Sequence, residues 1–273
     1  MQFYHFIISA EEMSNRKKNC MECFTRLGIQ PCFLDAVMGK NLSQDELRNL
    51  AHDNGLLKVG AIGCALSHLK AYRQFLQSKE KCAYIFEDDA QLTEKFIALQ
   101  PEIQKFMEKQ TKPTVLALYR FDGLKRKIQD LDHEICIMRS FGGTASHAYV
   151  INRSAAENLL RAQTPVRIEF DAWAIYQKLG FINLYCLNKD VVILNDALSQ
   201  ESTIEVKPNP IQSNPIQSNQ NISMVSESDA AHLKAIKKGQ FHFWYQQLPL
   251  NGKIKFHLRR ILRHIQEIYY ERD

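Results

Sequence analysis

Three consecutive acidic residues, Glu87, Asp88 and Asp89, follow a short hydrophobic run at residues 83–86. Adjacent carboxylates repel one another, so holding three together makes sense if a divalent cation neutralises them. If the run is a buried strand, the acids emerge at its carboxyl end, where open α/β sheets bind ligands. Strand alternation then places Glu87 and Asp89 on one side and Asp88 on the other. The alternative is an acidic turn that only ends a strand, and the tripeptide alone does not decide between them.

Three other segments carry residue types suited to a binding site. Residues 60–68 predict the start of a helix with two glycines that carries Ser67 and His68, although His68 by itself is more often a structural helix residue. The Gly-Gly-Thr sequence at 142–144 permits close approach of the backbone to a ligand, or forms an ordinary turn. Asp171 begins an apolar helical segment, where it is either a functional carboxylate or a helix N-cap.

These candidates need a scaffold, and β-rich runs alternate with helical patterns over residues 1–200, which is typical of an α/β sheet covered by helices. The predicted strands are residues 3–9, 31–36, 83–86, 114–120, 145–152 and 182–187. The predicted helices are residues 15–27, 43–54, 60–77, 153–162 and 171–179. Ser43 followed by Glu46 indicates a capping box at the second of these helices.

Together these segments resemble glycosyltransferase family 25, the lipooligosaccharide-type galactosyl- and glucosyltransferases of bacterial envelopes, to which animal collagen galactosyltransferases are related. The matching segments keep the family order: Phe6-Ile7-Ile8-Ser9, Asn15-Arg16, Phe33-Leu34-Asp35-Ala36-Val37 with Gly39, Gly63-Cys64 to Ser67-His68, Phe86-Glu87-Asp88-Asp89, Gly143-Thr144 to Tyr149-Val150-Ile151, and Phe170-Asp171. The resemblance implies a GT-A-like fold, a Rossmann-type mixed sheet flanked by helices. A nucleotide-sugar half at about 1–112 would join an acceptor half at about 113–200.

The resemblance also implies a metal site at the acidic triplet. Glu87, Asp88 and Asp89 stand where such enzymes carry an Asp-x-Asp motif that holds Mn²⁺ or Mg²⁺ on the donor diphosphate. We expect Glu87 and Asp89 to bind the metal and Asp88 to contact the donor. A bridging cation lowers the cost of the negative charge that develops on the departing nucleoside diphosphate.

Further roles follow from the family pattern. The acceptor hydroxyl loses its proton as it attacks, so a carboxylate must act as general base. Asp171 is the expected base, and Asp122, which follows the strand predicted at 114–120, is the second candidate. The remaining expected donor contacts are Ser9, Asp35, Ser67, His68, Gly143 and Thr144.

The expected activity is inverting transfer of galactose or glucose from a UDP-sugar to a lipooligosaccharide-type acceptor that is lipid-linked. The alternative is a non-catalytic saccharide- or membrane-binding protein on a degenerate transferase fold. No P-loop sequence and no complete dinucleotide fingerprint occurs in the chain, which disfavours those two enzyme classes. Seven cysteines without a disulfide pattern and an N-terminus without a signal peptide favour a cytoplasmic location, peripheral on the inner face of a bacterial inner membrane.

The C-terminal third has a different character. Residues 201–227 are rich in Pro, Asn and Ser, and they contain the repeat Asn-Pro-Ile-Gln-Ser, which predicts a linker. Helices are predicted at 228–248 and from 253 onward as a C-terminal extension. Residues 253–273 hold six Lys or Arg against three acids, or +3 of the net +5, so the basic charge belongs to one element and no nucleic acid is expected as a partner.

The last predicted helix is amphipathic. One face collects apolar residues: Ile254, Leu258, Ile261, Leu262, Ile265, Ile268 and Tyr269. Such a helix either lies on an anionic membrane surface or packs its apolar stripe on the main domain, and the sequence leaves both open.

Overall fold

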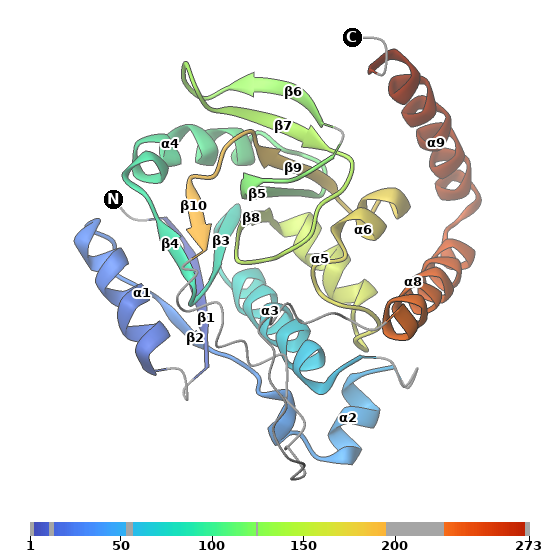
Figure 1. The fold of residues 1–273 in the computed structure, drawn as a ribbon, viewed down its shortest axis with the longest axis horizontal. Coiled ribbons are helices and arrows are strands. Elements are labelled where there is room, and N and C mark those ends of the chain that lie inside the picture. The colour runs from blue at the N-terminus through green and yellow to red at the C-terminus, as the bar shows by residue number, and fades with distance from the viewer. Residues whose placement is uncertain (1–2, 11–13, 53–56, 124, 195–226, 271–273) are drawn as a thin grey trace, which may run out of the picture.

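The computed structural model describes residues 3–10, 14–52, 57–123, 125–194 and 227–270, and its centre is an eight-stranded sheet in the order β2-β1-β3-β8-β5-β9-β7-β6 (Figure 1). The strands are β1 (His5–Ser9), β2 (Phe33–Asp35), β3 (Cys82–Glu87), β4 (Ala90–Leu92), β5 (Thr114–Arg120), β6 (Lys125–Asp130), β7 (Cys136–Ser140), β8 (Ala148–Asn152), β9 (Asn183–Leu187) and β10 (Val192–Leu194). The α-helices are α1 (Ser14–Arg26), α2 (Gln44–Leu50), α3 (Val59–Gln77), α4 (Glu94–Glu108), α5 (Arg153–Ala162), α6 (Trp173–Leu179), α8 (Glu227–Gln247) and α9 (Leu250–Tyr270).

The sheet is mixed, with parallel pairs at β2-β1-β3 and at β5-β9 and antiparallel pairs elsewhere. Strand β1 pairs in parallel with both β2 and β3, β8 runs antiparallel to β3 and β5, and β9 is parallel to β5. Strands β4 and β10 form a separate antiparallel pair. Helices α3 and α5 pack on each other and on the central strands, and α4 packs on β3 and β8. The expected α/β fold, a Rossmann-like mixed sheet flanked by helices, is confirmed.

The central strands are continuous hydrophobic runs, without alternation of polar and apolar residues, because both of their faces are buried. All five residues of β8 and the first five of β3 are buried, because helices cover this part of the sheet. The edge strand β6 is the opposite case, with five exposed residues and one half-buried residue. Strand β3 belongs to the half expected at about 1–112 and β8 to the half expected at about 113–200. Because these two strands pair, both halves share one continuous sheet.

The predicted elements are present, with shifts at their ends. The strand predicted at 145–152 begins only at Ala148, and the helix predicted at 171–179 begins at Trp173. The helix predicted at 43–54 ends at Leu50. Its capping box is confirmed, because the Ser43 hydroxyl accepts from the Glu46 backbone N–H at 3.2 Å and the Glu46 carboxylate accepts from the Ser43 N–H at 2.8 Å.

The C-terminal helices α8 and α9 follow each other at an open angle, and both contact α6 of the main domain (Figure 1). Trp244 is 4% exposed and packs against Tyr176 and Phe181, with ring centroids 6.1 and 5.8 Å away. Helix α9 instead leaves Ile254 and Leu258 53% and 54% exposed, so this described part of the apolar stripe does not pack on the domain. None of the described helices is both long enough and apolar enough to cross a membrane. The predicted linker lies outside the described residues, except for Glu227, the first residue of α8.

A glycine contact fixes the start of α3 against the chain that follows β2. A Cβ atom on Gly63 would lie 2.5 Å from the Val37 carbonyl oxygen and 2.6 Å from the Gly39 nitrogen. Both neighbours are backbone atoms, which cannot move aside as a side-chain tip can. The close approach therefore requires glycine at position 63, one turn before the segment that carries Ser67 and His68.

Substituting Gly63→Ala should lower the free energy of unfolding by about 1–3 kcal/mol, the usual cost of overpacking a tight contact. The matched control is Gly239→Ala in α8, where the added Cβ meets nothing within 4 Å. There the higher helix propensity of alanine should raise stability by up to about 1 kcal/mol. Urea denaturation measures both changes, and equal effects at the two positions would contradict the packing argument.

Candidate active site

The three residues of the acidic triplet at the end of β3 contact two different parts of the protein. The strand ends at Glu87, and Asp88 and Asp89 form the turn that leads into β4. Arg16 on α1 reaches both turn residues, with its Nε 3.0 Å from Asp88 Oδ1 and its second terminal nitrogen paired with Asp89 Oδ2. The expectation that Asp88 faces away from Asp89 is therefore wrong, because strand alternation does not continue through the turn.

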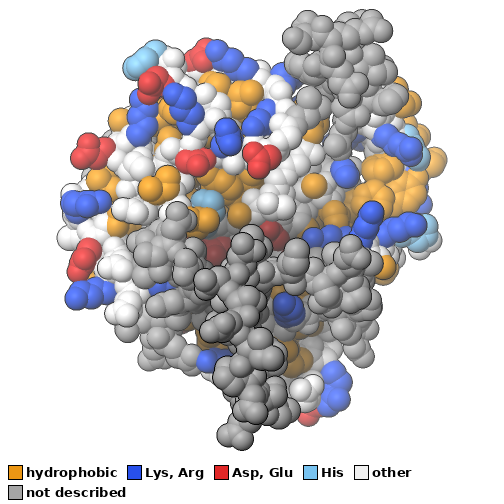
Figure 2. Space-filling model, in the orientation of Figure 1, with side chains coloured by type: hydrophobic (Ala, Val, Ile, Leu, Met, Phe, Trp, Pro, Cys, Tyr) orange, Lys and Arg blue, Asp and Glu red, His pale blue; other side chains and the backbone are white. Residues whose placement is uncertain are grey.

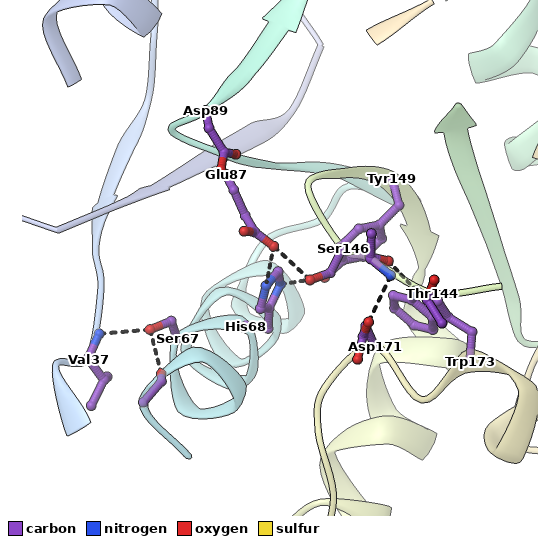
Figure 3. Close-up of polar contacts among 12 residues, drawn as sticks. Val37, Ser67, His68, Glu87, Asp89, Thr144, Ser146, Tyr149, Asp171 and Trp173 are labelled. Carbon is purple, nitrogen blue, oxygen red and sulfur yellow. Dashed lines mark hydrogen bonds and ion pairs between the residues drawn. The ribbon is translucent and has the colours of Figure 1, made fainter. Parts of the chain in front are cut away.

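Glu87 faces the other way, toward α3 and the loop before β8, as Figure 3 shows. Ser146 donates a hydrogen bond to Glu87 Oε1 at 2.6 Å, and His68 Nε2 lies 3.4 Å from the same oxygen. Burial acts to raise the pKa of Glu87, but His68 and Ser146 outweigh it and hold that pKa below its ordinary value. Glu87 is thus a charged carboxylate set in a polar pocket of the fold.

His68 is held by aromatic neighbours. Its Nδ1 lies 2.9 Å from the Tyr149 hydroxyl, which in turn is 2.8 Å from the Tyr72 hydroxyl. The Phe170 ring stacks on the imidazole with centroids 3.9 Å apart. These contacts fix the orientation of the ring and aim Nε2 at Glu87.

The loop between β7 and β8 adopts a strained conformation that Asp171 supports. Ala145 has φ +68°, in the left-handed region that disfavours side chains. Asp171 Oδ2 accepts a hydrogen bond from the Ala145 N–H at 2.8 Å. The Ala145 carbonyl accepts from Trp173 Nε1 at 2.7 Å and from the Tyr119 hydroxyl at 2.6 Å. These bonds fix the residue that precedes Ser146 in the chain.

Asp171 is not the N-cap of α6. The N-cap residue is Ala172, which makes no side-chain capping bond. The alternative interpretation of Asp171 as a simple helix cap is therefore wrong, and its carboxylate faces the Gly-Gly-Thr loop instead (Figure 3).

The glycine and threonine of that loop have different environments. A Cβ on Gly143 would lie 2.5 Å from the Phe121 ring, so this position needs glycine for packing. Thr144 is exposed, and its carbonyl oxygen accepts from the Tyr119 hydroxyl at 3.3 Å.

Ser9 and Ser67 are both buried, and both have neighbours within the protein. Ser67 accepts from the Val37 N–H at 2.8 Å and donates to the Gly63 carbonyl at 2.7 Å, so its hydroxyl joins α3 to the segment after β2. Ser9 lies against Asp88: burial raises the pKa of Asp88, and hydrogen bonding to Ser9 acts in the opposite direction.

Asp35 and Asp122 are exposed. The backbone oxygen of Asp35 accepts from Lys70 Nζ at 2.9 Å at the end of β2. The Asp122 side chain is 98% exposed and lies 3.8 Å from Arg120, in the turn between β5 and β6. The contacts described here do not connect either residue with Glu87 or Asp171.

Electrostatic effects show which of the carboxylates converge. Burial raises the pKa of the Cys64 thiol well above its ordinary value, and Glu87, Asp171 and Asp89 add to the rise in that order. Burial, followed by the charge of Glu87, raises the pKa of Asp89 to about 6, although Arg16 opposes the shift. Glu87, Asp89 and Asp171 therefore lie within electrostatic reach of one thiol, although they come from separate parts of the chain.

Asp88 and Asp89 line a pocket beside the acidic turn, whereas Glu87, Cys64 and Asp171 are not part of its lining. Asp89 Oδ1 is buried and makes no hydrogen bond among the described residues, so its lone pairs are open to a ligand. The pocket has a volume of about 460 Å³ and adjoins the acidic turn on the α1 side. Its lining is Asn19, Cys20, Glu22, Cys23, Arg26, Asp88, Asp89, Ala90 and Gln91. Oxygen ligands of this kind suit Mn²⁺ or Mg²⁺.

The comparisons with known proteins agree with this architecture. The sequence model of "Glycosyltransferase family 25 (LPS biosynthesis protein)" matches residues 3–174, more than half of the 273-residue chain. The chain belongs to glycosyltransferase family 25. The match covers every expected site residue, from Ser9 to Asp171.

Two curated relatives carry the same family name. A "Glycosyltransferase 25 family member" of Aedes aegypti is 27% identical over 94 residues, which are 31% of this chain and 16% of the relative. Another, from Drosophila pseudoobscura pseudoobscura, is 28% identical over 94 residues, which are 31% of this chain and 15% of the relative. The aligned region of this family 25 chain thus covers less than a fifth of the length of either relative.

Removing the Asp171 carboxylate should release the strained loop. Asp171→Ala leaves the Ala145 N–H without its charged acceptor and should cost about 1–3 kcal/mol of stability. Ala145→Gly removes the left-handed strain, so the loss caused by Asp171→Ala should be smaller in that background. Urea denaturation of the four proteins in this double-mutant cycle measures the coupling. Strict additivity would show that Asp171 does not stabilise the conformation of Ala145.

Proposed function

We propose that this family 25 chain is a cation-dependent, inverting hexosyltransferase that moves galactose or glucose from a UDP-sugar to a lipid-linked saccharide of the lipooligosaccharide type. The observation that carries the proposal is the convergence of Glu87, Asp89 and Asp171 around Cys64, beside a strained loop. The pKa of Glu87 is lowered and that of Asp89 is raised, and shifted pKa values of neighbouring carboxylates are typical of catalytic sites. Membership of the family supports the reaction class.

The cation acts on the leaving group. Breaking the anomeric bond places negative charge on the departing UDP, and Mn²⁺ or Mg²⁺ on its diphosphate supplies several kcal/mol of stabilisation. Glu87 and Asp89 hold this cation, and the partnerless Asp89 Oδ1 supports the assignment. Asp88, which lies against Ser9, contacts the donor. Arg16 pairs with Asp88 and Asp89, and its charge offsets the repulsion between them.

The base accepts the proton of the acceptor hydroxyl. We assign this role to Asp171, whose Oδ2 is used to hold Ala145 and whose Oδ1 takes the proton. Asp122 is the weaker candidate, because its side chain is 98% exposed and an exposed carboxylate cannot exclude water from the reacting atoms.

The other expected donor contacts have unequal support. His68 is aimed at Glu87 and lies close enough to orient that carboxylate, and Gly143 brings the loop backbone against Phe121. The Ser67 hydroxyl already bonds within the protein, so Ser67 would act by holding α3 in place. Thr144 and Asp35 are exposed and free to meet a nucleotide from solvent.

Asp89→Asn should abolish Mn²⁺-stimulated hydrolysis of a UDP-sugar, because the amide removes the negative charge that holds the cation. The control is Asp45→Asn, whose side chain is 84% exposed on α2. A panel of UDP-sugars with and without Mn²⁺ measures the activity, and a thermal melt checks that each variant folds. Undiminished turnover in folded Asp89→Asn would remove the metal assignment. No turnover by the folded wild-type chain on any donor, with donor binding retained, would favour a non-catalytic saccharide-binding protein.

The C-terminal helices support a peripheral membrane location at the cytoplasmic face of a bacterial inner membrane, where a lipid-linked acceptor would lie. Leu250, Ile254, Leu258 and Ile261 recur on one side of α9 and are 53–76% exposed. Figure 2 shows hydrophobic and basic side chains together over the region where α8 and α9 meet. An apolar stripe bordered by Lys and Arg is suited to the interface of an anionic bilayer.

Replacing Ile254, Leu258 and Ile261 together by serine should release the protein from vesicles of anionic lipid, while transfer to a soluble acceptor continues. Sedimentation with the vesicles measures binding, which should also weaken as salt screens the basic residues. The control replaces three exposed apolar residues elsewhere, Val59, Ile128 and Ile193, by serine. Equal sedimentation of the two triple variants would contradict a role for α9.

A further inference from the structure

A thiol, an imidazole and a carboxylate meet at one point beside the acidic turn. Cys64 and His68 lie one helical turn apart on α3, so both side chains project from the same face of the helix. Glu87 approaches this face from the end of β3. The three ligand atoms, one from each residue, all lie within 4.8 Å of one another.

The imidazole nitrogen at this point has a polar neighbour among the described residues, the Glu87 carboxylate. His68 is 1% exposed, and its Nε2 makes no hydrogen bond among the described residues. The 3.4 Å separation from Glu87 Oε1 brings the two groups into ion-pair range without a directed hydrogen bond. This contact is long for a hydrogen bond, and a metal ion between the two groups would give the buried nitrogen a full bond.

The surrounding contacts are those that orient metal ligands. The Tyr149 hydroxyl lies 2.9 Å from His68 Nδ1, the nitrogen opposite the one aimed at Glu87. Phe170 stacks on the ring, and Ser146 donates to Glu87. Metal-bound histidines and carboxylates characteristically have such partners on their remaining atoms, which fix the ring and the carboxylate in place.

We propose that Cys64, His68 and Glu87 bind one thiophilic divalent transition-metal ion of the Zn²⁺ class. A thiolate and an imidazole select such an ion over Mg²⁺ or Mn²⁺, which prefer oxygen ligands throughout. Three protein ligands leave one position of a tetrahedral ion open, as in catalytic zinc sites. Cys64 is half-buried.

This ion differs from the cation of the proposed function. The Mn²⁺ or Mg²⁺ assigned above sits on the donor diphosphate with Asp89, whereas the Cys64 site takes a softer ion on the α3 side of Glu87. The carboxylate of Glu87 has two oxygens and can contribute to both. The inference does not depend on sugar transfer, because the ligand set is present whether or not the chain turns over a donor.

Titration of the full-length, chelator-treated protein with Co²⁺ tests the proposal. Co²⁺ replaces Zn²⁺ in such sites and gives a thiolate-to-metal absorption band that Mn²⁺ and Mg²⁺ do not give. We expect a band that saturates at one equivalent, is displaced by Zn²⁺ and is lost in Cys64→Ser. The control is Cys32→Ser, which removes the exposed free thiol and should keep the band. Absence of the band in wild type, or its survival in folded Cys64→Ser, would overturn the proposal.

Tyr149→Phe supplies a second arm if Cys64→Ser does not fold. This variant keeps all three ligands and removes the hydroxyl at His68 Nδ1, so the band should remain while the affinity for Co²⁺ falls by about 10–100-fold. Unchanged affinity would contradict the assignment of His68 as a ligand. Binding of Co²⁺ is measured independently of the proposed activity. A protein that binds Co²⁺ but hydrolyses no UDP-sugar would disprove the transferase proposal alone. An active protein without the absorption band would disprove the metal site alone.

Discussion

The negative charge of Glu87, Asp88 and Asp89 at the end of β3 has to be neutralised within the protein. This need determines which elements pack around the site. Asp88 is 5% exposed, and the side chains of Glu87 and Asp89 are 25% and 13% exposed. Carboxylates that leave water must find hydrogen-bond donors or positive charge. The protein meets this need from two sides, with Arg16 of α1 on Asp88 and Asp89, and α3 with the loop before β8 on Glu87. The acidic turn thereby joins α1, α3 and β8 into one unit.

The hydrogen bonds of Glu87 depend on residues that are distant in the sequence. Ser146, which donates to Glu87, directly follows Ala145, whose left-handed conformation costs roughly 1–2 kcal/mol for a residue with a side chain. Asp171, Trp173 and Tyr119 offset that cost with hydrogen bonds to both backbone groups of Ala145. Asp171 thus helps to position Glu87 in addition to any contact with a substrate, and the two carboxylates form a single structural system.

The sequence predicts the scaffold where local signals agree with the tertiary structure. The strand at 114–120 and the helix at 153–162 have the predicted bounds, because the strand is a continuous hydrophobic run and the helix is an amphipathic pattern that begins after the N-cap Asn152. Helix α4 was not predicted; Pro101 lies inside it, and proline normally ends a helix. Strand β6 was missed because its charged, mostly exposed residues carry no hydrophobic pattern, and only pairing with β7 defines it.

The same distinction applies to the site. The acidic triplet and Asp171 could be found because each stands at the end of a hydrophobic element. Arg16 could be matched only to a family motif. A basic residue on an amphipathic helix is normally expected to be solvated, and only the folded structure shows that Arg16 contacts Asp88. Tyr149 and Ser146 lie in a strand and a loop without any local signal, and their roles depend on contacts with residues more than fifty positions away in the chain. The left-handed Ala145 was hidden because the two preceding glycines are the residues expected to take that conformation.

The energetic cost of this arrangement bears on the choice between an enzyme and a degenerate binding fold. A sheet of this size folds without three adjacent carboxylates at the end of one strand, a strained alanine or a buried imidazole nitrogen that makes no hydrogen bond among the described residues. Each of these features lowers stability by the order of 1–3 kcal/mol relative to apolar or unstrained substitutes. Such costs accumulate at sites where charge must be placed against a reacting group, and they are not needed to bind a saccharide through hydroxyl contacts. The gathering of all three features around Glu87, within the family 25 segment, therefore favours catalysis over passive binding.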